Sequence, residues 1–257
     1  MAFPANTVSQ ISSHLQSTLS LHPSSQWLQS FLSTQKSNIP LSSLLATARI
    51  RLLNSDLTSS LSTNSSTSSS SSSTSPAGNM TFPSDIHNAD VKERRLPGPI
   101  ALQILGVEDL TRSRWEQIEA IEAAERGEGT KGREVVRVVP EADGGGGGGG
   151  GGRAGGPAPR GGPSERGSGS CKVLMQDARG IMAFGIELKP VKGLSGGMSI
   201  GTKVVLRNVL VARGVLLLEP NTTTLLGGRI EASHKAWIDN RKAELRAGIG
   251  GMEGTRR

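Results

Sequence analysis

Two low-complexity tracts decide which parts of this chain can fold. Residues 59–75 are almost all Ser and Thr, and residues 144–169 are almost all Gly, Pro, Arg and Ser, with nine consecutive glycines at their start. Neither tract carries enough apolar surface to offset the conformational entropy lost on ordering, so both are predicted to be disordered. The foldable remainder is two blocks, one before the serine tract and one that the glycine tract interrupts.

The first block has the apolar periodicity of helices. Runs at residues 7–19, 27–32 and 41–57 place apolar side chains at helical spacing, and Thr7 to Gln10 has the form of a capping box. Loops this short between helices are typical of a small bundle. We predict a three-helix bundle over residues 1–60, with Trp27 and Phe31 in its core, and a Ser/Thr-rich linker over residues 61–95.

The second block has the alternation and β-branched content of strands. Five strands are predicted, at residues 99–107, 172–177, 181–188, 203–209 and 215–219. A glycine-containing connection at residues 178–180 joins the second and third as a hairpin. Five strands with few helical crossovers indicate a small closed barrel, and the OB-fold fits this count best. The predicted fold class is therefore α+β, with a five-stranded OB-fold barrel over residues 96–250 and a C-terminal helix over residues 231–247 that covers one end.

The glycine run lies inside an insertion, residues 111–170, between the first two strands. Because loop-closure entropy rises only with the logarithm of length, the barrel tolerates such an insertion. The first half of the insertion has the sequence pattern of a helix. Ser113 to Glu116 is a second capping box, and Trp115, Ile118 and Ile121 form an apolar stripe. The four glutamates of this helix are predicted to form a solvated face. Residues 134–139 are a short β-prone stretch, and residues 140–170 are predicted to be disordered.

Composition and charge narrow the class of protein. The chain has a formal net charge of +7, and its excess lies in residues 171–257, which hold fourteen basic and seven acidic side chains. This asymmetry suits an acidic partner, either nucleic acid or protein. No stretch has the roughly 20 apolar residues of a membrane helix, and no signal peptide is evident. With one cysteine, Cys171, we expect a soluble, unexported protein of a reducing compartment.

The residue pattern argues against an enzyme. Residues 196–203 resemble a phosphate-binding loop, but they end in Gly-Thr-Lys and lead into a strand, so a strand connector is the better interpretation. The four histidines are scattered, and His234 is interpreted as an edge residue of the core. No nucleophile or metal-ligand motif is present in the sequence. We predict no catalytic residue, no metal and no cofactor.

Direct nucleic-acid binding is the weaker of two functional hypotheses. OB barrels bind single strands by stacking bases on aromatic side chains, and the predicted strands contain one aromatic residue, Phe184. The basic residues that could contact phosphates are Lys172, Lys189, Lys203, Arg207 and Arg213. Binding through them alone would be weak, salt-sensitive and unspecific. A protein-binding barrel is favoured, and the alternative is a stand-alone module for single-stranded or branched DNA.

Several segments resemble the RecQ-mediated genome instability protein 1 family. They are residues 96–104 (LPGPIALQI), 110–118 (LTRSRWEQI), 201–209 (GTKVVLRNV), 213–221 (RGVLLLEPN) and 225–228 (LLGG). The resemblance covers residues 96–250, and the most specific part is the pair formed by the last two segments. The N-terminal helices agree more loosely.

The resemblance implies a non-catalytic partner of topoisomerase III, acting with a RecQ-family helicase to dissolve double Holliday junctions in the nucleus. The insertion would enter the topoisomerase gate. Because the chain resembles the short form of the family, no second OB subunit is expected as a partner. The predicted topoisomerase-binding residues are Arg114, Trp115, Ile118, Val135, Val136, Val138 and Lys203. Trp115 could equally pack in the barrel core. Possible DNA-binding residues are Lys172, Lys189, Arg207 and Arg213.

Overall fold

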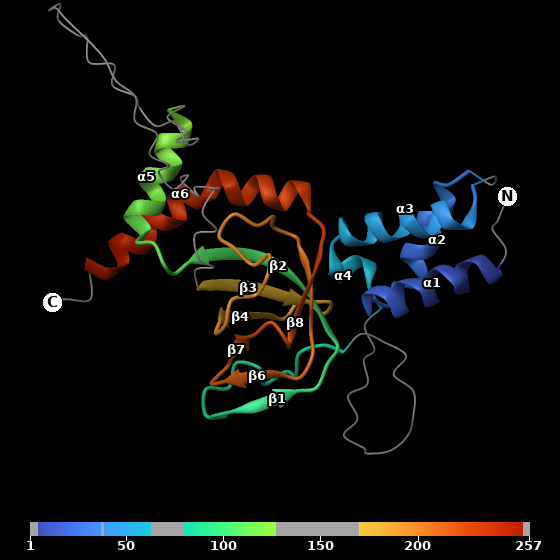
Figure 1. The fold of residues 1–257 in the computed structure, drawn as a ribbon, viewed down its shortest axis with the longest axis horizontal. Helices are drawn as coiled ribbons and strands as arrows, with labels where there is room; N and C mark the ends of the chain where they lie inside the picture. The colour runs from blue at the N-terminus through green and yellow to red at the C-terminus, as the bar shows by residue number, and fades with distance from the viewer. Residues whose placement is uncertain (1–4, 37–38, 63–79, 127–169, 254–257) are drawn as a thin grey trace, which may run out of the picture.

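The chain folds into a helical bundle followed by a curled sheet with two further helices (Figure 1). The computed structural model describes residues 5–36, 39–62, 80–126 and 170–253. The helices are α1 (Ala5–Leu19), α2 (Ser25–Ser33), α3 (Leu41–Leu53), α4 (Leu57–Ser60), α5 (Arg114–Glu125) and α6 (Glu231–Glu253). The strands are β1 (Arg94–Leu96), β2 (Ile100–Asp109), β3 (Cys171–Asp177), β4 (Met182–Glu187), β5 (Lys203–Leu206), β6 (Val209–Ala212), β7 (Val215–Leu218) and β8 (Thr223–Gly227). The predicted order of bundle, OB-like barrel and C-terminal helix is confirmed.

Two details of the helical bundle differ from the prediction. Helix α1 already includes Ala5, so Thr7 lies in its first turn and does not cap it. The third predicted helix is divided in two, because Asp56 caps α4 by accepting a hydrogen bond from the Thr58 backbone N–H at 2.8 Å. The ring of Phe31 is buried and stacks on the partly buried ring of Trp27, with centroids 5.5 Å apart. These two aromatic residues belong to the bundle core, as predicted.

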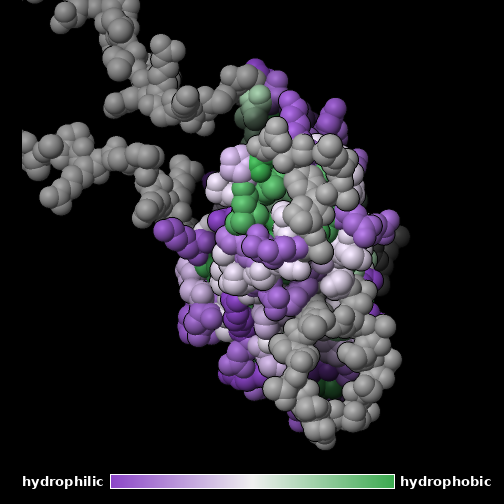
Figure 2. Space-filling view, turned by 90° about the vertical axis from the view of Figure 1, so that its right-hand side faces the viewer, coloured by the Kyte–Doolittle hydropathy of each residue, from purple (hydrophilic) through white to green (hydrophobic). Residues whose placement is uncertain are grey.

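The bundle presents a mainly hydrophilic outer surface. Figure 2 looks at the molecule from the bundle side and shows one compact apolar cluster among hydrophilic residues. Among the described residues of the bundle, the large apolar side chains with high exposure are Leu41 and Ile50 of α3, at 39% and 60%.

The sheet has eight strands within the described residues, where five were predicted. Their order is β1-β6-β7-β4-β3-β2-β5-β8, and every pair is antiparallel except β4 with β7. Two long strands are bent: residues 203–212 break into β5 and β6, and residues 215–227 break into β7 and β8. Asn208 forms the first bend with a left-handed φ of 51°. Polar residues mark both bends, Arg207 and Asn208 at the first and residues 219–222 (EPNT) at the second, and the predicted strands did not continue beyond them through β6 and β8.

The bends curl the sheet into a half-barrel. In the strand order, β6 and β7 lie on one side of β2 to β4, while their chain neighbours β5 and β8 lie on the other. The connections β5–β6 and β7–β8 are short, so the two sides of the sheet must curve toward each other. The enclosed core also takes Phe82 and Ile86, which are 1% and 0% exposed, so the chain joins the barrel before the predicted linker end at residue 95.

The bundle and the half-barrel pack against each other. Ala101 of β2 and Ala178 after β3 are buried in the bundle core, and the Arg229 backbone N–H donates to Asn54 Oδ1 at 2.9 Å. The closest approach is at Gly228, which has a φ of 94°. A Cβ atom placed there would lie 2.2 Å from the Leu53 carbonyl oxygen. Only glycine fits this position, so the position of the bundle depends on it.

Candidate partner interface

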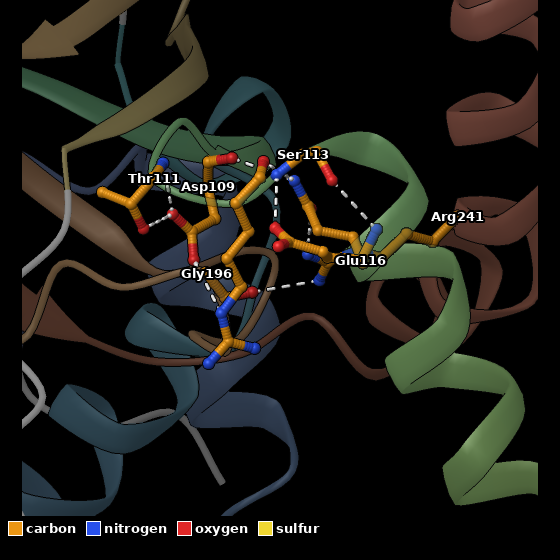
Figure 3. Close-up of polar contacts among 8 residues, drawn as sticks. Asp109, Thr111, Ser113, Glu116, Gly196 and Arg241 are labelled. Atoms are coloured by element: carbon orange, nitrogen blue, oxygen red, sulfur yellow. Dashed lines mark hydrogen bonds and ion pairs between the residues drawn. The ribbon is translucent and has the colours of Figure 1, made fainter.

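Helix α5 begins the insertion and is held firmly at its first turn. The capping box is present as predicted: the Glu116 backbone N–H donates to Ser113 Oγ at 3.2 Å, and the Ser113 backbone N–H donates to Glu116 Oε2 at 2.8 Å (Figure 3). Arg114 donates to Glu108 Oε1 at 3.0 Å and to the Gly248 carbonyl at 2.8 Å. Ile118 is 2% exposed. These contacts tie the root of the insertion to β2 and to α6.

Arg241 of α6 connects three elements at the root of the insertion. Its guanidinium donates to the Gly196 carbonyl at 3.0 Å, shown in Figure 3, and to Gln117 Oε1 at 3.3 Å, and it lies 4.4 Å from the centroid of the Trp237 ring. Gln117 is buried and also donates to the carbonyls of Asp109 and Arg112. A buried side chain with these partners is costly to displace. Gly196, singled out for its phosphate-loop pattern, serves here as a connector, as predicted.

A groove of about 410 Å³ runs along α5 beside this cluster. It is lined by Asp109, Arg112, Gln117, Ala120, Ile121, Ala124, Gly196, Gly197 and Arg241. Burial alone would raise the pKa of Asp109, but hydrogen bonds from Thr111 and the charges of Arg112 and Arg241 outweigh it and lower the pKa. The groove therefore combines an ionised Asp109, balanced by two arginines, with the apolar side chains of Ala120, Ile121 and Ala124.

The glutamate face of α5 is not simply solvated, contrary to the prediction. Glu122 lies 3.3 Å from Lys242 Nζ and is also paired with Arg246, and Glu125 lies 2.7 Å from Lys242 Nζ. The hydrogen bond to Lys242 lowers the pKa of Glu122. The i, i+3 spacing showed that these carboxylates share a face, but only the position of α6 shows what that face meets.

The structure separates the predicted topoisomerase-binding residues into different environments. Trp115 is 62% exposed, which removes the alternative that it packs in the barrel core. Arg114 and Ile118 instead hold α5 in place. Leu110, which was not predicted, is also exposed, at 47%, on the turn before α5. Val135, Val136 and Val138 lie outside the described residues, as does the predicted disorder of the glycine tract.

Lys203 is fully buried and does not lie on a surface that a partner could reach. Its ammonium donates to the Gly201 carbonyl at 2.6 Å, and its side chain is 0% exposed. Burial lowers the pKa of Lys203 to about 8, although the Asp56 charge opposes this. Asp56 also accepts from the Gln103 amide at 3.1 Å, and that amide donates to Gln176 at 2.9 Å. The predicted partner residue is therefore part of a polar network between bundle and barrel.

Replacing Lys203 with methionine is expected to raise the free energy of unfolding at pH 7 by about 1–2 kcal/mol, because a buried ammonium costs more than its hydrogen bond returns. The folded pKa lies below the unfolded value, so the wild type gains stability as pH rises from about 8 to about 10.5. The variant lacks that gain. Urea unfolding of both proteins at pH 7 and at higher pH measures this effect. If the free energies of unfolding of the two proteins differed by the same amount at every pH, the prediction would be wrong.

The four possible DNA-binding residues do not form one basic patch. Lys172 lies at the start of β3, with its ammonium 4.4 Å from the centroid of the Phe184 ring, and Lys189 is paired with Glu219 at 2.8 Å. Arg207 is at the β5–β6 bend and donates to Ser20 Oγ of the bundle at 2.6 Å. Arg213 is exposed at the β6–β7 turn. Lys172, Lys189 and Arg213 lie around β4, whereas Arg207 lies apart beside the bundle, so the four cations do not form a single phosphate track.

The described residues lack two other kinds of functional feature. No group of three or more His, Cys, Asp or Glu residues lies together there in a way that could hold a metal ion. Within these ranges, no helix is both long enough and apolar enough to cross a membrane. His234 accepts a hydrogen bond from the Ile200 backbone N–H at 3.1 Å, which supports its interpretation as an edge residue of the core.

A bundle docked on a half-barrel, with an insertion anchored between β2 and β3, defines an OB-fold protein with an N-terminal helical domain. Residues 82–241 match the family model for the RMI1 N-terminal OB-fold domain, and residues 15–60 match the one for the RMI1 N-terminal helical domain. The chain therefore belongs to the RecQ-mediated genome instability protein 1 family, as the sequence segments indicated.

Two relatives of that name show how far the similarity extends. The protein from Schizosaccharomyces pombe (strain 972 / ATCC 24843) is 32% identical over 164 residues, which is 63% of this chain and 66% of the relative. The Xenopus laevis protein is 46% identical over 48 residues, which is 18% of this chain and 9% of the relative. In both cases the chain covers less than two thirds of the relative's length.

Proposed function

We propose that this chain is a non-catalytic partner of topoisomerase III, acting with a RecQ-family helicase in genome stability and in the dissolution of double Holliday junctions in the nucleus. Family membership supports the link to the RecQ pathway. The observation that carries the topoisomerase contact is the exposed Trp115, which stands on a helix fixed at its root. Exposed tryptophans are frequent anchors of protein interfaces.

The physical basis of the proposal is a rigid platform for the insertion. Arg114, Gln117 and Arg241 fix α5 against β2 and α6 through the contacts described above. Trp115 is therefore presented in a defined position, and little conformational entropy is lost when a partner binds it. The groove beside α5 supplies a second contact area of mixed character, with Ala120, Ile121 and Ala124 beside charged side chains. The insertion therefore starts from a fixed point at the root of α5.

Trp115→Ala tests this platform. The side chain is 62% exposed, so we expect the free energy of unfolding to change by no more than about 0.5 kcal/mol. Binding to purified topoisomerase III is expected to weaken by about tenfold or more, as for a central interface tryptophan. The measurement is a titration by pull-down at moderate salt with nuclease present.

Two control variants make the result specific. Ile50→Ala removes another exposed apolar side chain, on α3 of the bundle, and should leave topoisomerase binding unchanged. Ile118→Ala removes a buried side chain and should cost about 2–4 kcal/mol of stability. Wild-type affinity in the Trp115 variant would contradict the proposed contact. Loss of binding on nuclease treatment would favour the DNA-binding alternative.

A further inference from the structure

The outward face of β4 is apolar along its whole length. Side chains of a strand alternate between faces, and the inward Ala183, Gly185 and Glu187 are buried. The outward residues are Met182, Phe184, Ile186 and, just past the strand, Leu188, which together we call the β4 face. Met182 and Phe184 are each 47% exposed and Leu188 is 57% exposed. An antiparallel sheet face in contact with water normally carries polar residues, so this row is an exception.

Neighbouring strands widen the β4 face into a band. Leu174 of β3 lies opposite Phe184, while Val215 and Leu217 of β7 lie opposite Phe184 and Ile186. All three flanking side chains are partly exposed. At one side the band borders a hollow of about 180 Å³, lined in part by Leu174, Phe184 and Trp237. Such a hollow can take one large apolar side chain of a partner.

The charges beside the band are mainly positive. The Lys172 ammonium lies 4.4 Å from the centroid of the Phe184 ring. Arg213 is exposed at the turn before β7. Lys189 follows Leu188 and has an exposed fraction of 66%, although it is paired with Glu219.

Most of the nearby acids are paired with another cation or buried. Glu108, opposite Lys172, is held by Arg114 at 3.0 Å, and Glu187 is buried and accepts backbone hydrogen bonds from Cys171 and Val191. Glu244 also lines the hollow and is exposed, so it offsets one of these positive charges. An apolar centre with a basic rim is complementary to a partner with an apolar stripe between acidic residues.

We propose that the β4 face binds an acidic amphipathic helix of a protein partner, a surface distinct from the platform at α5. Both edges of β4 are already paired, with β3 and β7, so a partner cannot add a strand there and must dock through side chains. Residues 182 to 188 span about 20 Å at 3.3 Å per residue, which matches about 13 residues of α-helix. Single-stranded nucleic acid fits less well, because among the side chains of the β4 face only Phe184 offers a ring for base stacking.

The test uses a fluorescein-labelled peptide of about 16 residues, with Leu and Phe at i, i+3, i+4 and i+7 and with Asp and Glu elsewhere. Fluorescence anisotropy with the full chain is expected to show saturable binding. The triple variant Met182→Thr, Phe184→Thr, Leu188→Thr keeps strand propensity and should weaken binding by about tenfold or more. Ile50→Thr, at an exposed apolar position of the bundle, is the matched control and should bind as the wild type does.

Two further probes decide the kind of partner. A peptide with Lys in place of every acidic residue should bind about fivefold more weakly than the acidic peptide at low salt. Absence of acidic-peptide binding, or equal loss in the Ile50→Thr control, would overturn the proposal. Tighter binding of a thymidine oligonucleotide that the triple variant abolishes would also overturn it and assign the face to single-stranded nucleic acid. Thermal unfolding of each variant shows that the fold is retained.

Discussion

Replacing Gly228 with alanine is expected to lower the free energy of unfolding by about 3–5 kcal/mol, which is a large part of the stability of a typical domain. Two costs combine at this position. Its φ of 94° is unfavourable for any residue with a Cβ atom, and the new methyl group would meet the Leu53 carbonyl oxygen at 2.2 Å. Leu53 ends α3, so relief of the clash requires the bundle to move away from the barrel. Urea unfolding and limited proteolysis of the bundle are the measurements.

The adjacent glycine provides a matched control for backbone strain alone. Gly227 has a similar φ of 86°, but a Cβ atom there would meet nothing within 4 Å. Gly227→Ala should therefore cost about 1–2 kcal/mol, and the bundle should keep its protection from protease. Gly197→Ala, at an ordinary φ and in open space, should be nearly neutral. Equal destabilisation by the Gly227 and Gly228 substitutions would show that the contact with Leu53 contributes little.

Our proposed function requires that this protein stimulate decatenation by topoisomerase III. Replacing residues 127–169 with a Gly/Ser linker of about ten residues is expected to reduce that stimulation about tenfold or more. Such a linker reaches about 33 Å when extended, enough to return along the roughly 18 Å length of α5. Decatenation of linked circular DNA by the topoisomerase, with and without this protein, is the measurement. Full stimulation by the shortened protein would contradict the proposed role of the insertion.

Stability of the shortened protein separates loss of function from loss of folding. The replacement retains the contacts at both ends, including the α5 ion pairs, the 2.9 Å hydrogen bond from Leu110 N–H to the Ser170 carbonyl, and the 3.0 Å hydrogen bond from Ser170 Oγ to the Glu187 carbonyl. A shorter loop loses less entropy on closure, so stability should be unchanged or higher by about 1 kcal/mol. Unfolding at lower urea concentration would show that the replaced segment supports the barrel.

Several parts of the site depended on contacts that the sequence pattern does not contain. The capping box at Ser113 and Glu116 is local, so four residues of sequence were enough to predict it. Lys203 was predicted at the partner surface but is fully buried, and Trp115, for which surface and core were both left open, is mostly exposed. A lysine at the first position of a strand has no local feature that predicts its burial. Its environment is set by Asp56 and Gln103, which are far away in the chain.

The sequence by itself determined most of the helices, five of the strands and the family. Helical and strand periodicities show which side chains of an element share one face and can be buried together. Such periodicities are short-range properties of the chain. Tertiary structure decided what those elements meet. The bends at Asn208 and after Leu218, the fit of Gly228 against Leu53, and the pairing of the α5 glutamates with α6 join residues far apart in the sequence. Such contacts form only when the whole chain is folded, because each depends on a surface that other elements build.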